Sequence, residues 1–387
     1  MLNTKFSSWP LFSEEEADAV KNVLLSNKVN YWTGDECRKF EKEFSTWSES
    51  KYSVALGNGT LALDIAFKAL DISYGDEVIV TSRSYIASIS SIVNSGATPV
   101  FADVDLKSQN ITPESIRSVV TDKTKAIVCV HLAGWPCDMD EVMALANENG
   151  WYVIEDCAQA HGASYKGKSV GSIGHIGCWS FCQDKIMTTG GEGGMVTTND
   201  EALWRKMWAY KDHGKSYEAV YESEQPKGNH FRWLNESFGT NGRMTEMQAA
   251  IGRIQLKRML DWHKKRLNNA NYIWNAAKEC KGLRVATVPD YIKHAAYKCY
   301  VFVEGGVELR DKMMAQINEK GVPCYSGACP EVYLEKAFDN TDFRPKKRLA
   351  NAKKLGESSL MFLVHPTLTK EEIKKTCDIL TEVALAN

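Results

Sequence analysis

A single lysine, Lys185, stands shortly before a run of glycines in the segment "SFCQDKIMTTGGEGG", residues 180–194. A lysine in this position could do two kinds of chemistry. If the glycines bind a phosphate, Lys185 is a phosphate ligand. If they let the backbone pass close to a flat molecule, Lys185 is instead a covalent attachment point. Other residues of the chain must distinguish these alternatives.

A phosphate site is predicted elsewhere, in "ALGNGTLALDIAFKAL", residues 55–70, where a turn of small residues leads directly into a helical pattern. Free amides at a helix N-terminus, here around Gly59, together with the hydroxyl of Thr60 suit a phosphate. The alternative is a plain turn with Thr60 as the helix N-cap. Ser180 ends an apolar run in "CWSF" and could donate a further hydrogen bond to the phosphate. The segment has neither the GK[ST] of a Walker loop nor the GxGxxG of a dinucleotide fold.

Two further residues suit a flat heterocycle. Asp156 follows an apolar strand pattern in "VIEDCAQAHG", and a carboxylate there needs a cationic partner, such as a protonated ring nitrogen, or several hydrogen bonds. Its alternative roles are a salt bridge or a helix N-cap. Tyr85, in "VTSRSYIASISS", lies between a strand and a helix and could stack on a ring, or be an ordinary half-buried tyrosine.

A lysine, a carboxylate, an aromatic ring and a phosphate site together describe a site for pyridoxal 5′-phosphate. In such a site Lys185 binds the cofactor covalently, and Asp156 keeps the ring nitrogen protonated. The glycines after Lys185 let the backbone turn closely past the cofactor and its substrate. The combination therefore favours Lys185 as the covalent anchor.

The elements that must position these residues alternate between strands and helices. Residues 77–81, 98–104, 125–132 and 151–157 form strand-like runs that are apolar throughout, which is typical of a parallel sheet covered on both faces. Between them, Ser13 with Glu16 predicts a capping box, Thr112 before Pro113 predicts a helix start, and Gly150 predicts a helix end. This order predicts an α/β fold with a mainly parallel sheet.

The second half of the chain is richer in helical patterns. Residues 200–214 and 244–280 are predicted to be helical, a strand follows in "YKCYVFVE", and "TKEEIKKTCDILTEVALA" closes the chain as a helix. We predict a large domain over residues 1–255 and a smaller C-terminal α/β domain over residues 256–387.

Composition excludes several classes of protein. The chain has 387 residues, of which 44% are hydrophobic and 25% charged, and its formal net charge of −2 comes without a basic stripe, so no nucleic-acid partner is expected. No segment has the length of a membrane span, and the first twenty residues lack the apolar stretch of a signal peptide. The eleven cysteines contain no CxxC pair, so we expect reduced thiols in a cytoplasmic protein and no metal site.

The chain resembles the DegT/DnrJ/EryC1/StrS family of sugar aminotransferases, which have the type I pyridoxal-phosphate-dependent fold. The resemblance spans nearly the whole chain and is strong because the motifs follow one another in the family's order. These motifs are "WTGDECRKFEKEFSTW", "GNGTLAL", "GDEVIVTSRSYIAS", "GATPVFADVD", "VHLAGWPCDMD", "EDCAQAHGASYKG", "SFCQDKIMTTGGEGG" and "GTNGRMTEMQAAIG". Tyr325 and "SGACPEVY" depart from the histidine-rich stretch of many relatives, which puts the sugar contacts in doubt.

The resemblance implies a role for each site residue toward the cofactor. Gly59, Thr60 and Ser180 meet the phosphate, Tyr85 stacks on the ring, and Lys185 is the anchor.

Three more roles follow from the same resemblance. Asp156 pairs with the ring nitrogen, and Gln159 lies near the 3-hydroxyl group. Asn241, in "TNGRM", is similar to the asparagine that reaches the phosphate from the neighbouring subunit. The family therefore implies a homodimer with two shared active sites.

The implied reaction moves an amino group, expected from L-glutamate, through pyridoxamine 5′-phosphate to a nucleotide-linked keto-sugar. A 4-keto-6-deoxyhexose is expected, with C4 favoured over C3, and the product would enter O-antigen, lipopolysaccharide or another glycoconjugate. The alternatives are the family's dehydratases, which replace the anchor lysine by histidine, a non-catalytic regulator that binds pyridoxal phosphate, and an amino-acid aminotransferase. Lys185 argues against the dehydratases.

Overall fold

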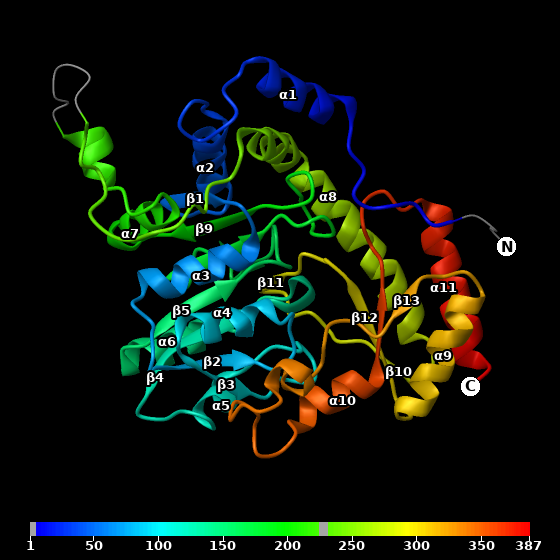
Figure 1. Cartoon of the computed structure of the whole chain (residues 1–387). Coiled ribbons are helices and arrows are strands. Elements are labelled where there is room, and N and C mark those ends of the chain that lie inside the picture. Colours follow the sequence, from blue (N-terminus) through cyan, green and yellow to red (C-terminus); the bar gives the residue numbers. More distant parts are fainter. Residues whose placement is uncertain (1–4, 224–230) are drawn as a thin grey trace.

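The structure is a computed structural model that describes residues 5–223 and 231–387. Its largest layer is a seven-stranded sheet (Figure 1). The strands are β1 (Tyr52–Leu56), β2 (Glu77–Thr81), β3 (Thr98–Ala102), β4 (Thr124–Val130), β5 (Tyr152–Asp156), β8 (Ile176–Ser180) and β9 (Gly194–Thr198). The four runs predicted as strands correspond to β2, β3, β4 and β5, which confirms that part of the prediction.

The sheet is mainly parallel, with one reversed strand. Its strands lie in the order β1-β9-β8-β5-β4-β2-β3, and all neighbours from β8 to β3 pair in parallel. Only β9 runs antiparallel to both of its neighbours. The parallel strands are apolar throughout because helices cover both faces of the sheet.

Seven helices belong to this layer: α1 (Glu14–Leu25), α2 (Glu36–Trp47), α3 (Gly59–Ala69), α4 (Ala87–Ser95), α5 (Pro113–Arg117), α6 (Met139–Asn149) and α7 (Glu201–Lys211). Residues of α3, α4 and α7, such as Leu63, Ile89 and Trp208, share one buried cluster with the sheet. Residues of α5 and α6 lie in a second cluster, and residues of α2 in a third. The sheet is therefore packed between layers of helices.

The predicted helix ends are confirmed. The backbone amide of Ser13 donates to Glu16 Oε2 at 2.7 Å, which completes the capping box of α1. Thr112 caps α5, with Pro113 at its first position. Gly150 ends α6 with φ of 71°, a conformation that glycine adopts without strain.

A second, smaller layer follows the long helix α8 (Glu246–Lys278). Its antiparallel sheet has the order β10-β12-β14-β13 and packs with α8, α9 and α11 around one buried cluster. The elements of this layer are β10 (Leu283–Arg284), β12 (Cys299–Val303), α9 (Val307–Glu319), β13 (Cys324–Tyr325), α10 (Ala350–Ser358), β14 (Ser359–Phe362) and α11 (Lys370–Leu385).

A third, small sheet consists of β6 (Ser164–Tyr165), β7 (Lys168–Ser169) and β11 (Ile292–Lys293). Short helical segments lie at Leu132–Gly134, Glu218–Glu222, Val332–Leu334 and Lys336–Phe338.

The expected domain boundary after residue 255 falls inside α8, which leads from the large sheet to the small one (Figure 1). The N-terminal segment also crosses between the layers, because Phe6 packs against the small layer and Ser7 bonds to Glu372 of α11. The division at residue 255 stays a prediction.

Arg83 connects the two layers at the carboxyl end of β2. Its Nε donates to Gln109 Oε1 at 3.0 Å, and its Nη2 donates to Ser359 Oγ of β14 at 3.3 Å. The side chain is fully buried. This contact ties the small sheet to the loop that carries Tyr85.

Among residues 5–223 and 231–387, no helix is both long enough and apolar enough to cross a membrane.

Candidate active site

A cleft of about 760 Å³ opens at the carboxyl ends of β2, β4, β5 and β8. Open α/β sheets bind ligands at this edge. Every residue expected in the site except Asn241 lines the cleft: Gly59, Thr60, Tyr85, Asp156, Gln159, Ser180 and Lys185. The fold therefore brings together residues that are up to 126 positions apart in the chain, from 59 to 185.

The N-terminus of α3 forms one wall of the cleft. Asn58, not Thr60, is the N-cap, because the Asn58 side chain accepts a hydrogen bond from the amide of Leu61 at 2.8 Å. Within the described residues no hydrogen bond engages the amides of Gly59 and Thr60. The alternative reading of Thr60 as the cap is thus wrong, and two backbone donors are free at this wall.

Ser180, at the end of β8, lies directly against this helix start. A Cβ atom added to Gly59 would come within 2.6 Å of Ser180 Cβ and 2.9 Å of its Oγ. Only glycine lets the two segments approach so closely. The Ser180 hydroxyl therefore stands beside the free amides, as a phosphate site requires.

Asp156 is buried at the end of β5 and held from two sides. Ser88 Oγ donates to its Oδ2 at 2.7 Å, and the amide of Ala158 donates to its Oδ1 at 3.1 Å. Ser84 Oγ lies 2.9 Å from Ser88 Oγ and extends this chain of hydroxyl groups. These contacts fix the orientation of a carboxylate that faces the cleft. The two serines were not predicted.

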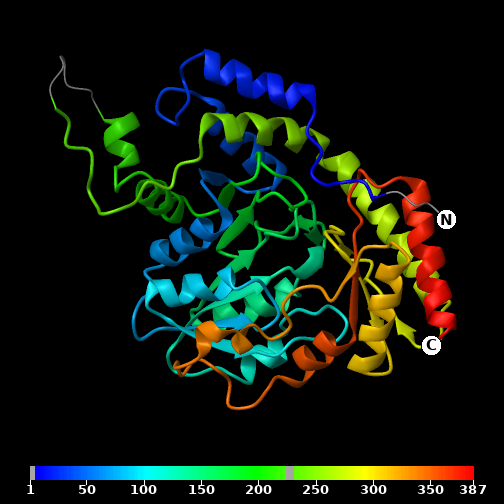
Figure 2. The same cartoon turned by 45° about the vertical axis from the view of Figure 1, so that its right-hand side comes forward.

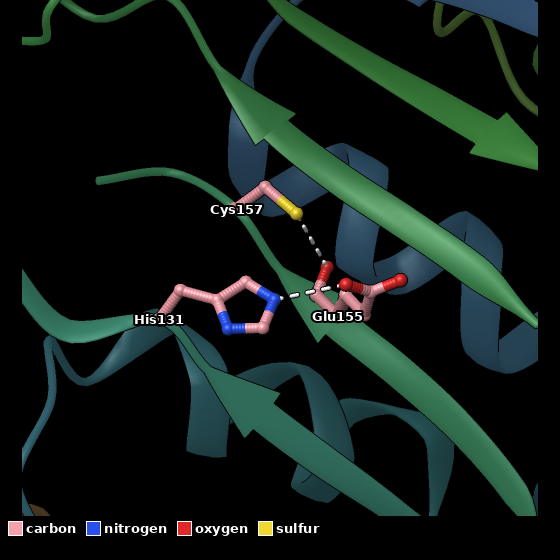
Figure 3. A group of neighbouring side chains, drawn as sticks. All are labelled: His131, Glu155 and Cys157. Atoms are coloured by element: carbon pink, nitrogen blue, oxygen red, sulfur yellow. Dashed lines mark hydrogen bonds and ion pairs between the residues drawn. The ribbon is translucent and has the colours of Figure 1, made fainter. Parts of the chain in front are cut away.

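Behind Asp156 lies a buried group of His131, Glu155 and Cys157, whose ligand atoms are close enough to hold a metal (Figure 3). Their hydrogen bonds argue against that role. His131 Nδ1 accepts from the amide of Cys137, so its Nε2 carries the proton and donates to Glu155 at 2.9 Å. Three backbone amides also donate to the Glu155 oxygens. Burial alone would raise the pKa of Glu155, but the hydrogen bonds from His131 and the amides outweigh burial and lower the pKa. The group fixes β5 rather than binding an ion.

Lys185 lies in the loop after β8, with its side chain 18% exposed in the cleft. Its Nζ is 3.6 Å from Asp184 Oδ1 and 5.4 Å from the centre of the Tyr297 ring. Trp9 Nε1 donates to the carbonyl oxygen of Lys185 at 2.7 Å. Sequence reasoning missed these three partners.

The other two predicted residues of the cleft differ in their exposure and contacts. Tyr85 is 71% exposed, so its ring is accessible to a ligand in the cleft. Gln159 is held, because its Oε1 accepts a hydrogen bond from the amide of Ala133 at 2.8 Å.

Asn241 lies outside the cleft, exposed, in the segment that enters α8 and paired with Asp212. This segment belongs to an arm, residues 212–223 and 231–245, whose ends are buried at Asp212 and Met244 and whose outer part projects from the body in both views (Figures 1 and 2). The arm carries large apolar side chains with high exposure: Phe231 at 77%, Trp233 at 89% and Phe238 at 100%. Exposed apolar surface of this kind marks an interaction site.

The chain matches the family model described as "DegT/DnrJ/EryC1/StrS aminotransferase family" over residues 10–381. The chain belongs to this family. The resemblance predicted from the motifs is therefore confirmed, together with the predictions of an aminotransferase, of the type I fold and of pyridoxal phosphate as its cofactor.

Three similar proteins illustrate the relationship. An aminotransferase of Psychrobacter cryohalolentis, known from its crystal structure, is 66% identical with a TM-score of 0.96, covering 98% of this chain and 99% of that one. A GDP-perosamine synthase of Escherichia coli O157:H7 is 38% identical over 70% of this chain and 73% of its own. A dTDP-3-amino-3,6-dideoxy-alpha-D-galactopyranose transaminase of Aneurinibacillus thermoaerophilus is 32% identical over 95% and 94%. The last two are named for nucleotide-linked amino sugars, and this chain is a sugar aminotransferase.

Proposed function

We propose that this aminotransferase transfers the amino group of L-glutamate to a nucleotide-linked keto-deoxysugar, with a 4-keto-6-deoxyhexose as the expected acceptor. The observation that carries the proposal is the single cleft in which Lys185, Asp156 and the free amides of α3 meet. The relatives named for perosamine and for an aminated galactose support a sugar acceptor.

The residues of the cleft suit pyridoxal phosphate. The free amides of Gly59 and Thr60, with the Ser180 hydroxyl beside them, would bind the phosphate. Tyr85 would cover one face of the ring.

Two further residues would hold the polar atoms of the ring. The fixed carboxylate of Asp156 would accept a hydrogen bond from the ring nitrogen, and Gln159 would lie near the ring hydroxyl. When bound, pyridoxal phosphate supplies an electron sink for negative charge on the carbon that loses its proton.

Lys185 would carry the cofactor and then act as general acid and base. Its Nζ would take the proton from the amine-bearing carbon of the donor, and later deliver a proton to the sugar carbon that receives the amine. Asp184 and Tyr297 would hold Nζ in reach of both carbons.

We infer a homodimer in which Asn241 of each subunit completes the phosphate site of the other. The exposed position of Asn241 outside its own cleft supports this arrangement, as does the apolar arm beside it. The described cysteines form no disulfide, which suits the reducing cytoplasm.

The position of the new amino group, at C4 or C3, stays a prediction, as does the delivery of the product to O-antigen or another surface polysaccharide. The name of one relative contains a sugar with its amino group at C3, so a test should include both 3-keto and 4-keto sugars as acceptors.

The proposal is tested by the absorbance of the purified enzyme loaded with pyridoxal phosphate. Glutamate should abolish the visible absorbance band, and only a matching nucleotide keto-sugar from a panel of dTDP, UDP and GDP compounds should restore it. A band that responds to no amino acid would contradict the proposal and favour a regulator. Restoration by α-keto acids alone would favour an amino-acid aminotransferase.

A further inference from the structure

A second lysine lies beside Lys185 and plays no part in the site described above. Lys298, just before β12, has its Nζ 4.7 Å from the centre of the Tyr297 ring, and Lys185 Nζ lies 5.4 Å from the same centre. The Tyr297 hydroxyl donates to Asp184 Oδ2. Both lysines therefore lie near the same tyrosine, whose hydroxyl group binds Asp184, and of these four residues Lys185 and Asp184 line the cleft.

Positive charge exceeds negative charge in this cluster. Arg266 of α8 is almost completely buried, and its only hydrogen bond within the described residues runs from Nη1 to the Tyr297 carbonyl oxygen at 3.4 Å. Its Nε and Nη2 have no partner there, and no carboxylate forms an ion pair with it. Among the described residues, Asp184 is the carboxylate whose charge acts on both Arg266 and Lys298, and it also forms an ion pair with Lys185.

The titration behaviour of the group agrees with this imbalance. Burial alone would raise the pKa of Asp184, but Lys185, the Tyr297 hydroxyl and Lys298 outweigh it and lower the pKa. Burial lowers the pKa of Lys298 to about 8, and the charges of Arg266 and Lys185 act in the same direction. An additional anion would relieve the repulsion among the three cations.

The Lys298 head group is available for such an anion. Within residues 5–223 and 231–387, no hydrogen bond or ion pair engages its Nζ. The side chain also lines a small cavity between the layers that is separate from the cleft. Ala133 connects the two, because it lines this cavity and its amide donates a hydrogen bond to Gln159 of the cleft. A purely structural lysine would be expected to have a carboxylate or carbonyl partner at this depth.

The chemistry of the reaction decides which anion belongs here. The phosphate of the cofactor has its own donors at α3, on a different element. In any α-amino acid the α-carboxylate is attached to the carbon that bears the reacting amine. A donor whose amine meets Lys185 must therefore place this carboxylate a few ångströms from Lys185 Nζ.

We propose that Lys298 binds the α-carboxylate of the amino donor and so selects α-amino acids as donors. The inference rests on the proposed function, since it assigns the donor subsite of the same reaction. Arg266 adds a fixed positive charge from behind, and Asp184 with Tyr297 positions the two lysines. Lys298 is thus a substrate-binding residue outside the group that holds the cofactor.

The test compares Lys298→Met with Lys298→Arg and with Lys264→Met, which removes an exposed lysine of α8. Loss of the visible band is titrated with glutamate, with its α-amide and with its γ-amide, glutamine. In the wild type and in Lys264→Met, glutamate should act at lower concentration than the α-amide. In Lys298→Met the half-saturating glutamate concentration should rise about 10- to 100-fold, as expected for a lost charge-assisted hydrogen bond.

The decisive readout is selectivity, which a merely structural effect would not change. Lys298→Met should lose the preference for glutamate over its α-amide yet keep the preference over glutamine, and Lys298→Arg should retain both. Equilibrium binding of unreactive glutarate, measured by calorimetry, should weaken in parallel. If Lys298→Met keeps the wild-type preference for glutamate over the α-amide, the inference is wrong. If the wild type itself responds to no amino acid, the proposed function fails instead.

Discussion

At the scale of single residues, two adjacent carboxylates on β5 have opposite roles. Glu155 points into the protein, where His131 and three amides use its oxygens, whereas Asp156 faces the cleft with two donors. Strand alternation places neighbours on opposite faces, so the sequence could predict that only one of the two carboxylates reaches the cleft. It could not predict Ser88, because that hydroxyl reaches Asp156 from a helix 68 positions away.

The charge of Asp156 is expected to hold the cofactor ring. Asp156→Asn should weaken binding of pyridoxal phosphate about 10- to 100-fold, because a hydrogen bond to a charged acceptor is replaced by a neutral one. Absorbance titration of the cofactor-free protein measures the effect. Glu192→Gln, which removes an exposed charge from the same cleft, is the control and should bind as the wild type. Equal binding by both variants would count against the role of Asp156.

At the scale of elements, the site depends on how α3 meets β8. The turn before α3 is readable from its small residues, and the apolar runs predict strands. The order and direction of the strands in the sheet cannot be predicted from the sequence, because all buried strands have similar apolar sequences. β9, reversed between β1 and β8, is what brings Ser180 opposite Gly59. The contacts of Trp9 and Tyr297 with Lys185 could not be predicted either, because both residues lie far from Lys185 in the sequence.

The close contact of Gly59 with Ser180 gives a prediction for the helix start. Gly59→Ala should displace Ser180 or the first turn of α3, because the new methyl group would lie 2.6 Å from Ser180 Cβ. Cofactor binding should fall at least tenfold, with a loss of stability of about 1–3 kcal/mol in thermal unfolding.

Gly57→Ala is the matched control, since a Cβ there meets nothing closer than 3.8 Å. It should bind the cofactor normally. A Gly59→Ala variant that binds pyridoxal phosphate as well as Gly57→Ala does would show that the free amides of α3 do not hold the phosphate.

At the scale of the whole molecule, the arm leaves a large apolar surface exposed to water. The arm exposes Phe231, Trp233 and Phe238, and each large apolar side chain left in water forgoes about 1.5–3 kcal/mol of burial. In the homodimer that we propose, a second copy of the chain covers them and Asn241 reaches the neighbouring cleft. Neither the projection of the arm nor these exposures could be predicted from sequence, because they depend on what the fold leaves uncovered.

Loss of the exposed apolar side chains of the arm is therefore expected to separate the subunits of the proposed homodimer. Trp233→Ser combined with Phe238→Ser should shift the protein toward monomer in sedimentation velocity, and the specific activity should fall with the dimer fraction. Tyr74→Ser, which removes an aromatic residue that is 93% exposed outside the arm, should leave the dimer intact. A double variant that stays dimeric and fully active would show that the arm serves another purpose.

The central claim is that Lys185 carries the cofactor, and chemical trapping tests it most directly. The enzyme loaded with pyridoxal phosphate is reduced with borohydride and digested, and the modified peptide is located by mass spectrometry. The account predicts that the cofactor is fixed to Lys185 in the peptide containing "SFCQDKIMTTGG", and that Lys185→Arg is not labelled although it still binds the cofactor. Labelling of another lysine, such as Lys298, or undiminished labelling of Lys185→Arg, would contradict the account.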